Sequence, residues 1–390
     1  MCRQGADLGL LMGWLQAGLV GLALLGGCGK SGARSDGGGG GGAGGAGGIS
    51  VGGAGGVGGT AGPDAAMPDA AGSGGGGSGG ANTDGSSPDR SSDAFRDASR
   101  PTPKLTWTMM LSGWNADFIA GAANGELWTA SKPSSVLQIH PDGTMSQTSL
   151  ALLGSAYVTG LWVAGPNNVY ASALANLVLH WDGSGTWKRD VMNSGLTFFS
   201  VWGSGPNDVY ASGGYPFHST GDDRWTAQPI LEPTTAGLGP LGGTGPGDIW
   251  IAGIYGEIFR SNGDGTGTWH KETTPATPGV NQIWVATPND AYMVSNATIM
   301  HRVPSTGRWV AEPTPLAGND YLHWIWGSGP NDVYAGTDQA HLFHSVGDGA
   351  WQDEGFDPGP GFPPAIKSIW GRTATDVYLG TTNGIYHGEP

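Results

Sequence analysis

Apolar and polar positions recur along the C-terminal three quarters of the chain with a period of about 42 residues, a length typical of propellers and solenoids. Each repeat has a short apolar run, a Gly-Pro-Asn-Asp type turn and a second run rich in β-branched and aromatic residues, as in VWGSGPNDVYASG from Val201. Similar blocks start at Leu161, Leu241, Ile283, Ile325 and Ile369, and a weaker one, MLSGWNADFIAGA, starts at Met110. The Asp or Asn of the turn marks seven repeats, at Asp117, Asn168, Asp208, Asp248, Asp290, Asp332 and Asp376.

Two more short runs complete each repeat. The first ends in a basic residue, usually His, and after a Gly-rich turn the second starts with Trp187, Trp225, Trp269, Trp309 or Trp351. No segment has the length and the 3.6-residue period of a helix. Four short strands in each of seven repeats predict an all-β fold, a seven-bladed β-propeller of four-stranded blades over residues 104–390.

Closure of the ring is left open by the sequence. The chain ends after the third strand of the last repeat, and residues 104–111 resemble the first strand of the first repeat. A fourth strand is therefore missing from the last blade. Residues 95–103 are a candidate for it, although Pro101 and Pro103 restrict that segment to a sheet edge.

The segment before the repeats has a different composition. Residues 30–103 consist mainly of Gly, Ala, Ser, Asp and Pro, and no aromatic residue occurs between Trp14 and Phe95. Such a segment cannot bury enough apolar surface to offset its chain entropy, so we expect a disordered tether. The expected organisation is a signal peptide over 1–27, a lipidated Cys and tether over 28–103, and the propeller over 104–390.

The first thirty residues have the layout of a secretory signal. Arg3 precedes an apolar run from Leu8 to Leu25, whose length also permits a transmembrane anchor. Leu25-Gly26-Gly27-Cys28 resembles the lipobox of bacterial lipoproteins, which implies acylation of Cys28 and cleavage before it. Gly29 after the Cys implies, by the same resemblance, sorting to the outer membrane.

The WGSGPNDVYA-type block, together with the Gly-rich tether, resembles the repeats of predicted surface lipoproteins of Gram-negative bacteria. This resemblance covers Cys28 to Pro390 and implies a propeller that faces the periplasm or the cell surface. It does not imply a chemistry, because propellers include enzymes, lectins and scaffolds.

Charge and cysteine content exclude several classes of function. The net charge of −15 opposes nucleic-acid binding, which requires clustered Lys and Arg. The two Cys, Cys2 and Cys28, both precede the repeats, so no Cys-based metal site is expected, and neither a metal nor another cofactor is predicted. No HExxH or DxDxDG motif and no distinctive pair of carboxylates indicates an enzyme.

Residues that recur at the same place in each repeat are predicted to be structural. The Trp series is expected to pack between blades, although it also permits an aromatic ring for sugars; its members are Trp162, Trp202, Trp284, Trp326 and Trp370. The His series lies on a ring too wide for one metal ion and is expected to hydrogen-bond to the repeat Asp or a neighbouring hydroxyl; its members are His180, His218, His301, His344 and His387.

Function is expected where the repeats differ. The connections between second and third strands and those between blades share one face, opposite the uniform turns. Aromatic and acidic residues on that face form a candidate binding rim, with irregular solvated loops as the alternative interpretation: Tyr215, Tyr255, Asp320, Tyr321, Asp338, Phe356 and Phe362. We therefore expect a lipid-anchored, monomeric and non-catalytic module that binds an envelope or extracellular protein or glycan. The alternative is a glycosidase-type or lyase-type enzyme that uses the central funnel.

Overall fold

The structure is a computed structural model that describes residues 104–390 except 151–155, 175, 192–196, 233, 235–236, 254, 262–266 and 276–278. The predicted signal peptide and tether lie outside the described residues. In the described ranges all regular structure is β, so there is no helix that could cross a membrane.

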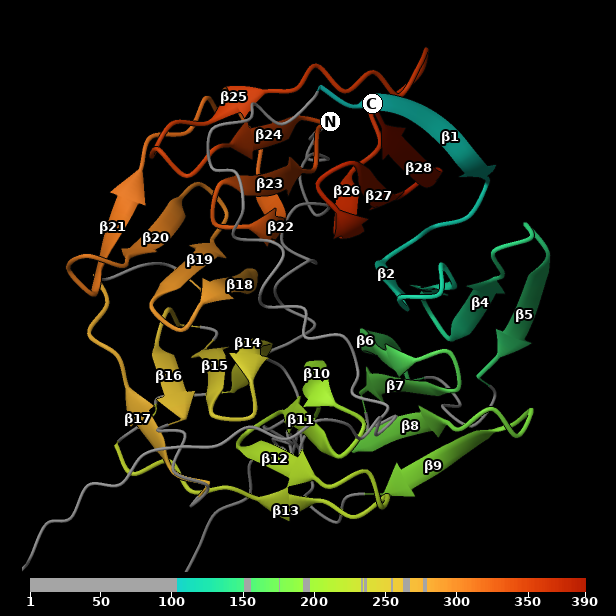
Figure 1. Cartoon of the computed structure of the whole chain (residues 1–390), viewed down its shortest axis with the longest axis vertical. Helices are drawn as coiled ribbons and strands as arrows, with labels where there is room; N and C mark the ends of the chain where they lie inside the picture. The colour runs from blue at the N-terminus through green and yellow to red at the C-terminus, as the bar shows by residue number, and fades with distance from the viewer. Residues whose placement is uncertain are drawn as a thin grey trace, which may run out of the picture. The chain divides into compact units, whose positions relative to one another are not determined.

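Seven antiparallel sheets of four strands each are arranged around one axis (Figure 1), as the sequence predicts. We number them blade 1 to blade 7 in chain order of their innermost strands. The strands of each blade are given from the innermost outward. Blade 1 is β2 (Phe118–Gly121), β3 (Leu127–Ser131), β4 (Ser135–Ile139) and β5 (Met145–Ser149), and blade 2 is β6 (Val158–Gly165), β7 (Asn168–Ala173), β8 (Leu177–Trp181) and β9 (Trp187–Val191). Blade 3 is β10 (Ser200–Gly205), β11 (Asp208–Ser212), β12 (Pro216–Ser219) and β13 (Thr226–Ala227), and blade 4 is β14 (Leu238–Gly245), β15 (Asp248–Gly253), β16 (Ile258–Ser261) and β17 (Trp269–Lys271). Blade 5 is β18 (Gln282–Thr287), β19 (Asp290–Val294), β20 (Ile299–Val303) and β21 (Arg308–Glu312), and blade 6 is β22 (Leu322–Gly329), β23 (Asp332–Thr337), β24 (Leu342–Ser345) and β25 (Gln352–Asp353). Blade 7 is β26 (Ile366–Thr373), β27 (Asp376–Thr381), β28 (Gly384–Glu389) and β1 (Thr106–Ser112).

The ring is closed by the first strand of the domain. β1 pairs antiparallel with β28, from Thr106 opposite Glu389 to Ser112 opposite Gly384, and so is the outermost strand of blade 7. Figure 1 shows β1 beside β28, close to the C-terminus. The prediction that residues 104–111 form the first strand of the first repeat is therefore wrong, and β1 occupies the place considered for residues 95–103.

This closure also corrects the first repeat marker. Asp117 precedes the innermost strand β2, whereas the other marker residues begin second strands. In blade 1 the residue before the second strand is Glu126, which lies 42 residues before Asn168, in line with the other spacings. Its carboxylate accepts a hydrogen bond from Gln138 of β4, as the repeat Asp does from His in other blades. The first repeat is therefore divergent in residue type and regular in length.

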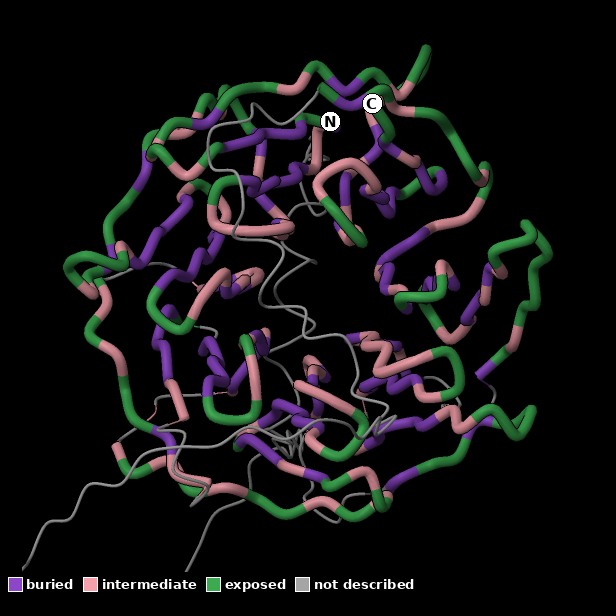
Figure 2. The backbone as a smooth tube through the Cα atoms, in the orientation of Figure 1, coloured by how far each residue is buried: buried purple, intermediate pink, exposed green. Residues whose placement is uncertain are grey.

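The hydrophobic core lies between the blades, and Figure 2 shows the inner strands as mainly buried and the outermost connections as exposed. Each repeat Trp of an innermost strand faces a Gly in the innermost strand of the next blade. A Cβ on Gly203 would lie 2.6 Å from the Trp162 ring, and a Cβ on Gly327 would lie 2.6 Å from the Trp284 ring. The same arrangement places Trp202 against Gly243, Trp326 against Gly371 and Trp370 against Gly121.

At the two interfaces without a Trp, the small residue comes from the earlier blade and the larger residue comes from the next blade. Blade 4 has Gly242 at the Trp position, and the following blade has Val285 where the others have Gly; the Val285 side chain lies 3.6 Å from a Cβ built on Gly242. In blades 1 and 2 the corresponding residues are Ala120 and Val163. A large residue therefore meets a small one at every interface, which fills the space between the blades evenly.

Candidate functional site at the axial end of blades 6, 7 and 1

In five of the seven blades the repeat His lies inside the blade, where it contacts the marker Asp or Asn and packs against an aromatic ring. His301 Nε2 is 2.8 Å from Asp290 Oδ1, and its ring stacks on Tyr292 with 4.0 Å between centroids. His218, His344 and His387 contact Asp208, Asp332 and Asp376 at 2.7–2.9 Å. His180 contacts Asn168 at 3.0 Å.

In blade 5 this contact extends into the next blade. His301 Nδ1 lies 2.8 Å from Glu312, whose other oxygen accepts a hydrogen bond of 2.7 Å from the Trp351 indole of blade 6. Burial lowers the pKa of His301, but the hydrogen bonds to Asp290 and Glu312 outweigh it and raise the pKa to about 9. These groups satisfy one another within the protein. No group of three potential ligands among the described residues could hold a metal ion.

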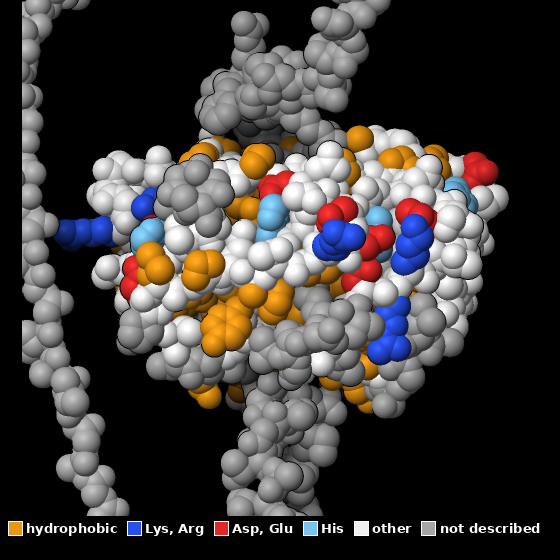
Figure 3. Space-filling model, turned by 90° about the horizontal axis from the view of Figure 1, so that it is seen from below, with side chains coloured by type: hydrophobic (Ala, Val, Ile, Leu, Met, Phe, Trp, Pro, Cys, Tyr) orange, Lys and Arg blue, Asp and Glu red, His pale blue; other side chains and the backbone are white. Residues whose placement is uncertain are grey.

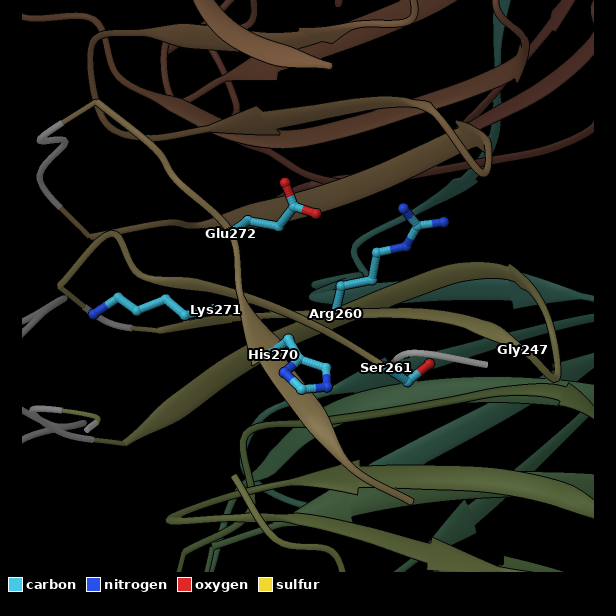
Figure 4. A pocket seen from close by; sticks show the side chains of 6 residues that line it. All are labelled: Gly247, Arg260, Ser261, His270, Lys271 and Glu272. Atoms are coloured by element: carbon cyan, nitrogen blue, oxygen red, sulfur yellow. The ribbon is translucent and has the colours of Figure 1, made fainter. Parts of the chain in front are cut away.

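Blade 4 departs from the series, because Arg260 replaces His. Its guanidinium contacts Asp248 at 2.8 Å and lies over the Trp250 ring at 4.8 Å. Nearby, a hollow of about 290 Å³ opens beside β16 and β17, where Gly247 has no side chain (Figure 4). In this view the Lys271 side chain points away from Arg260, and Lys271 pairs with Glu257. The charges around this hollow are thus already neutralised by protein partners.

The structure divides the predicted rim residues into exposed and buried ones. Tyr215, Tyr255 and Phe362 expose 52%, 64% and 87% of their surface, in connections on the variable face. Phe356 is buried between Trp107 and Tyr386, with ring centroids at 5.9 Å and 4.9 Å.

The acidic rim residues come together in blade 6. The Tyr321 backbone N–H donates to Asp338 at 2.9 Å, and Asp320 contacts His341 Nδ1 at 2.7 Å. Burial, and then the neighbouring Asp320 carboxyl, raises the pKa of Asp338. These contacts tie the connection before β22 to the connection between β23 and β24, at the end of blade 6 where its innermost strand begins.

A further cluster, which the sequence did not predict, lies at the same end of the inner strands. The residue three positions before the Trp position is ionisable in three consecutive blades, 6, 7 and 1: His323, Lys367 and Asp117. Together with Lys132 and Asp338 from adjacent connections, these residues form the axial cluster. The other four blades have uncharged residues at this position, namely Thr159, Phe199, Gly239 and Asn281.

Members of the axial cluster affect one another's charge. Burial lowers the pKa of His323 to about 4, and the charge of Lys367 adds to that effect, so His323 is neutral at pH 7. Burial also lowers the pKa of Lys367, against the opposing charge of Asp117. Asp117 itself accepts hydrogen bonds from the Lys132 backbone N–H at 2.9 Å and from Asn115 at 3.1 Å.

A signal for this cluster was present in the sequence. Ionisable residues at the start of an otherwise apolar innermost strand, as in Leu322-His323-Trp324 and Ile366-Lys367-Ser368, break the repeat pattern. The two segments are more than forty residues apart in the chain, and only ring closure places Asp117 beside them.

Seven four-stranded blades with closure by an N-terminal strand define the chain as a seven-bladed β-propeller protein. Neither a protein-family model nor a curated protein matches the sequence.

Solved structures share the fold at low sequence identity. "YCF48 bound to D1 peptide" is 14% identical with a TM-score of 0.59 and matches 74% of this chain and 95% of its own. YCF48 from Cyanidioschyzon merolae is 12% identical with a TM-score of 0.57, and matches 73% of this chain and 98% of its own. A streptogramin B lyase structure is 13% identical with a TM-score of 0.59, and matches 73% of this chain and 97% of its own. At these identities the likeness extends to the fold alone.

Proposed function

We propose that this chain is a lipid-anchored propeller of the cell envelope that binds a protein or a glycan and does not convert it chemically. The observation that carries the proposal is the exposure of Tyr215 and Tyr255, at 52% and 64%, in equivalent connections of the adjacent blades 3 and 4. Tyr is enriched at binding interfaces because its ring supplies apolar area and its hydroxyl a hydrogen bond.

The connection between blades 3 and 4 adds to this surface. Its Leu231 exposes 62% of its surface. The Leu238 N–H donates to Gly213 O at 2.6 Å, beside Tyr215, and Thr234 contacts Glu257 at 3.2 Å, close to Tyr255. Tyr215, Leu231 and Tyr255 therefore lie on connections that hold one another, and we call them the blade 3–4 surface.

Charge and fold likeness are consistent with a binding role. On the side of the ring that Figure 3 views, acidic, basic and apolar side chains are interspersed, and no broad basic field of the kind that nucleic acid requires is visible there. One of the similar propellers was solved with a bound peptide, so a fold of this kind can present a peptide-binding surface.

Binding can be tested with pull-down and glycan-array experiments on the full chain. We expect a captured partner to lose about tenfold or more in affinity on Tyr255→Ala, the usual scale for an exposed aromatic anchor. Val346→Ala is the matched control, because Val346 is similarly exposed, at 47%, in a turn on the opposite face. Turnover of a polysaccharide by the wild-type chain would instead favour the enzyme alternative.

Membrane attachment is tested separately. The proposal requires acylation of Cys28, so a clickable fatty acid should label the wild-type chain and leave Cys28→Ala unlabelled. Label retained by Cys28→Ala would refute the lipid anchor and leave the binding role intact.

A further inference from the structure

Lys367 is unusual among the basic residues of this acidic protein. Five of the others contact a carboxylate: Lys188, Arg260, Lys271, Arg302 and Arg372. The remaining basic side chains in the described part of the chain are exposed, except that of Lys367, which is half-buried and has no ion pair or hydrogen bond to a described residue. Its ammonium group keeps some contact with solvent, and partly removing such a group from water without a partner is unfavourable.

A β-bulge in β26 leaves the Lys367 side chain out of the regular packing of its blade. Pairing of β26 with β27 passes from Ile366 opposite Thr381 to Ser368 opposite Gly380, which leaves Lys367 as the extra residue of a β-bulge. Ile366 and Ser368 are both fully buried. The same kind of bulge makes His323 the extra residue in β22 and Thr159 the extra residue in β6, so the bulge recurs among the blades and the ionisable side chain is what distinguishes blades 6 and 7. Bulges commonly re-aim a side chain next to a functional site.

The groups around Lys367 come from the blades on both sides. β26, which carries Lys367, lies against β2 of blade 1 and against β22 of blade 6. The charges of Asp117 and Lys132 of blade 1 and of Asp338 of blade 6 act on Lys367. Asp117 and Asp338 already accept hydrogen bonds from backbone N–H groups, whereas the Lys367 ammonium group donates none to a described residue. Lys367 is thus the half-buried cation of the cluster, without a carboxylate partner among the described residues.

Aromatic side chains span the same three blades. Phe118 of β2 and Trp324 of β22 meet edge to face with 6.2 Å between ring centroids, although blade 7 separates their strands along the ring. The Trp324 indole donates to the Ile369 carbonyl of blade 7 at 3.1 Å. Both rings are half-buried, so the cation lies in a region that also offers apolar ring surface.

We propose that the axial cluster binds an acidic sugar, with Lys367 contacting its carboxylate and His323 and Asp338 hydrogen-bonding its hydroxyl groups. Lys367 is the only half-buried cation of the cluster, since Lys132 is exposed, and one such cation matches a monoanion. The charges of Asp117 and Asp338 disfavour a dianion such as a phosphate ester. Carboxylates and a neutral imidazole accept hydrogen bonds from hydroxyl groups, and aromatic rings pack against the C–H faces of sugars. The inference rests on the proposed binding role and narrows it to a ligand class.

Calorimetric titration of the full chain tests the ligand chemistry. Glucuronate should bind at least about tenfold more tightly than glucose, which lacks the carboxylate, and than acetate, which lacks the hydroxyl groups. Equal binding of glucuronate and glucose would overturn the role of the cation, and equal binding of glucuronate and acetate would overturn the sugar.

Substitutions test the residue. Lys367→Gln and Lys367→Met should each weaken glucuronate binding by about tenfold or more. Thermal unfolding should show that both fold, because they remove a charge poorly solvated in the native state. Lys104→Gln is the matched control, since Lys104 is exposed just before β1, and it should bind glucuronate as the wild type does. Unchanged affinity in the Lys367 variants would overturn the site.

Two results separate this inference from the proposed function. If a captured partner is lost on Tyr255→Ala but glucuronate does not bind, the binding role stands and the axial site is refuted. If a peptide with a free C-terminal carboxylate binds through Lys367 more tightly than glucuronate, and its C-terminal amide does not, the sugar assignment is overturned.

Discussion

A buried imidazole between two carboxylates makes part of the stability of this propeller depend on pH. His301 has a pKa near 9 in the folded chain against 6.5 for an ordinary His, so folding favours its protonated form. Its contribution is complete below pH 6.5 and is lost as the pH rises through about 9. His344 lies between Asp332 and Glu354 and also has a pKa of about 9.

We predict that His301→Ala lowers the free energy of unfolding by about 3 kcal/mol at pH 6.5, because Asp290 and Glu312 lose their shared cation. Denaturant unfolding measured between pH 6.5 and 9 should also show a shallower decline than in the wild type. His218→Ala serves for comparison, since its ring is 25% exposed and contacts one carboxylate, Asp208, and its loss should be smaller. An unchanged pH dependence in His301→Ala would contradict this interpretation.

Between the innermost strands of neighbouring blades, the contact of a Trp in one blade with a Gly in the next determines how closely the blades approach. A Cβ on Gly327 would lie 2.6 Å from both the Trp284 ring and the Asp332 carbonyl oxygen, closer than carbon atoms pack. Gly329, two residues along the same strand, has nothing within 4 Å of a Cβ.

Gly327→Ala should therefore destabilise the chain by about 1–3 kcal/mol through overpacking. Gly329→Ala should be neutral or slightly stabilising, because Ala restricts the unfolded chain more than Gly. Thermal unfolding of the two variants measures the difference. Equal melting temperatures would show that both the Trp284 ring and the Asp332 backbone can move aside and that the interface is not tightly packed.

For the whole molecule, the pairing of β1 with β28 determines whether the ring is closed. Thr106 and Glu389 face each other across this pair and are both exposed. In a background with Cys2 and Cys28 replaced by Ser, Thr106→Cys with Glu389→Cys should form an intramolecular disulfide. The bond should stabilise the chain by about 2–4 kcal/mol, because it joins the two ends of the ring.

A second cysteine pair is the negative control for this closure. Ser149 is exposed on β5, the outermost strand of blade 1, so Thr106→Cys with Ser149→Cys should remain reduced. Thiol labelling followed by mass spectrometry distinguishes the two pairs. A disulfide in the Ser149 pair and none in the Glu389 pair would refute the closure.

The overall architecture was readable from the sequence because the information that specifies a blade is local. Turn residues such as Pro206 and Asn207 separate apolar runs of strand length, and the block recurs in six of the seven repeats. The first repeat departs from this pattern because Glu126 and Gln138 replace the Asp and His of the other blades, while Asp117 matches the marker by chance.

The sequence by itself determined the class of fold, the number of blades and the place of the uniform turns, because each depends on residues close together in the chain. The tertiary structure alone decided that β1 completes blade 7, that Phe356 is buried while Phe362 is exposed, and that Lys367 lies near Asp117. These outcomes depend on contacts between residues up to some 280 positions apart, which only closure of the ring brings together.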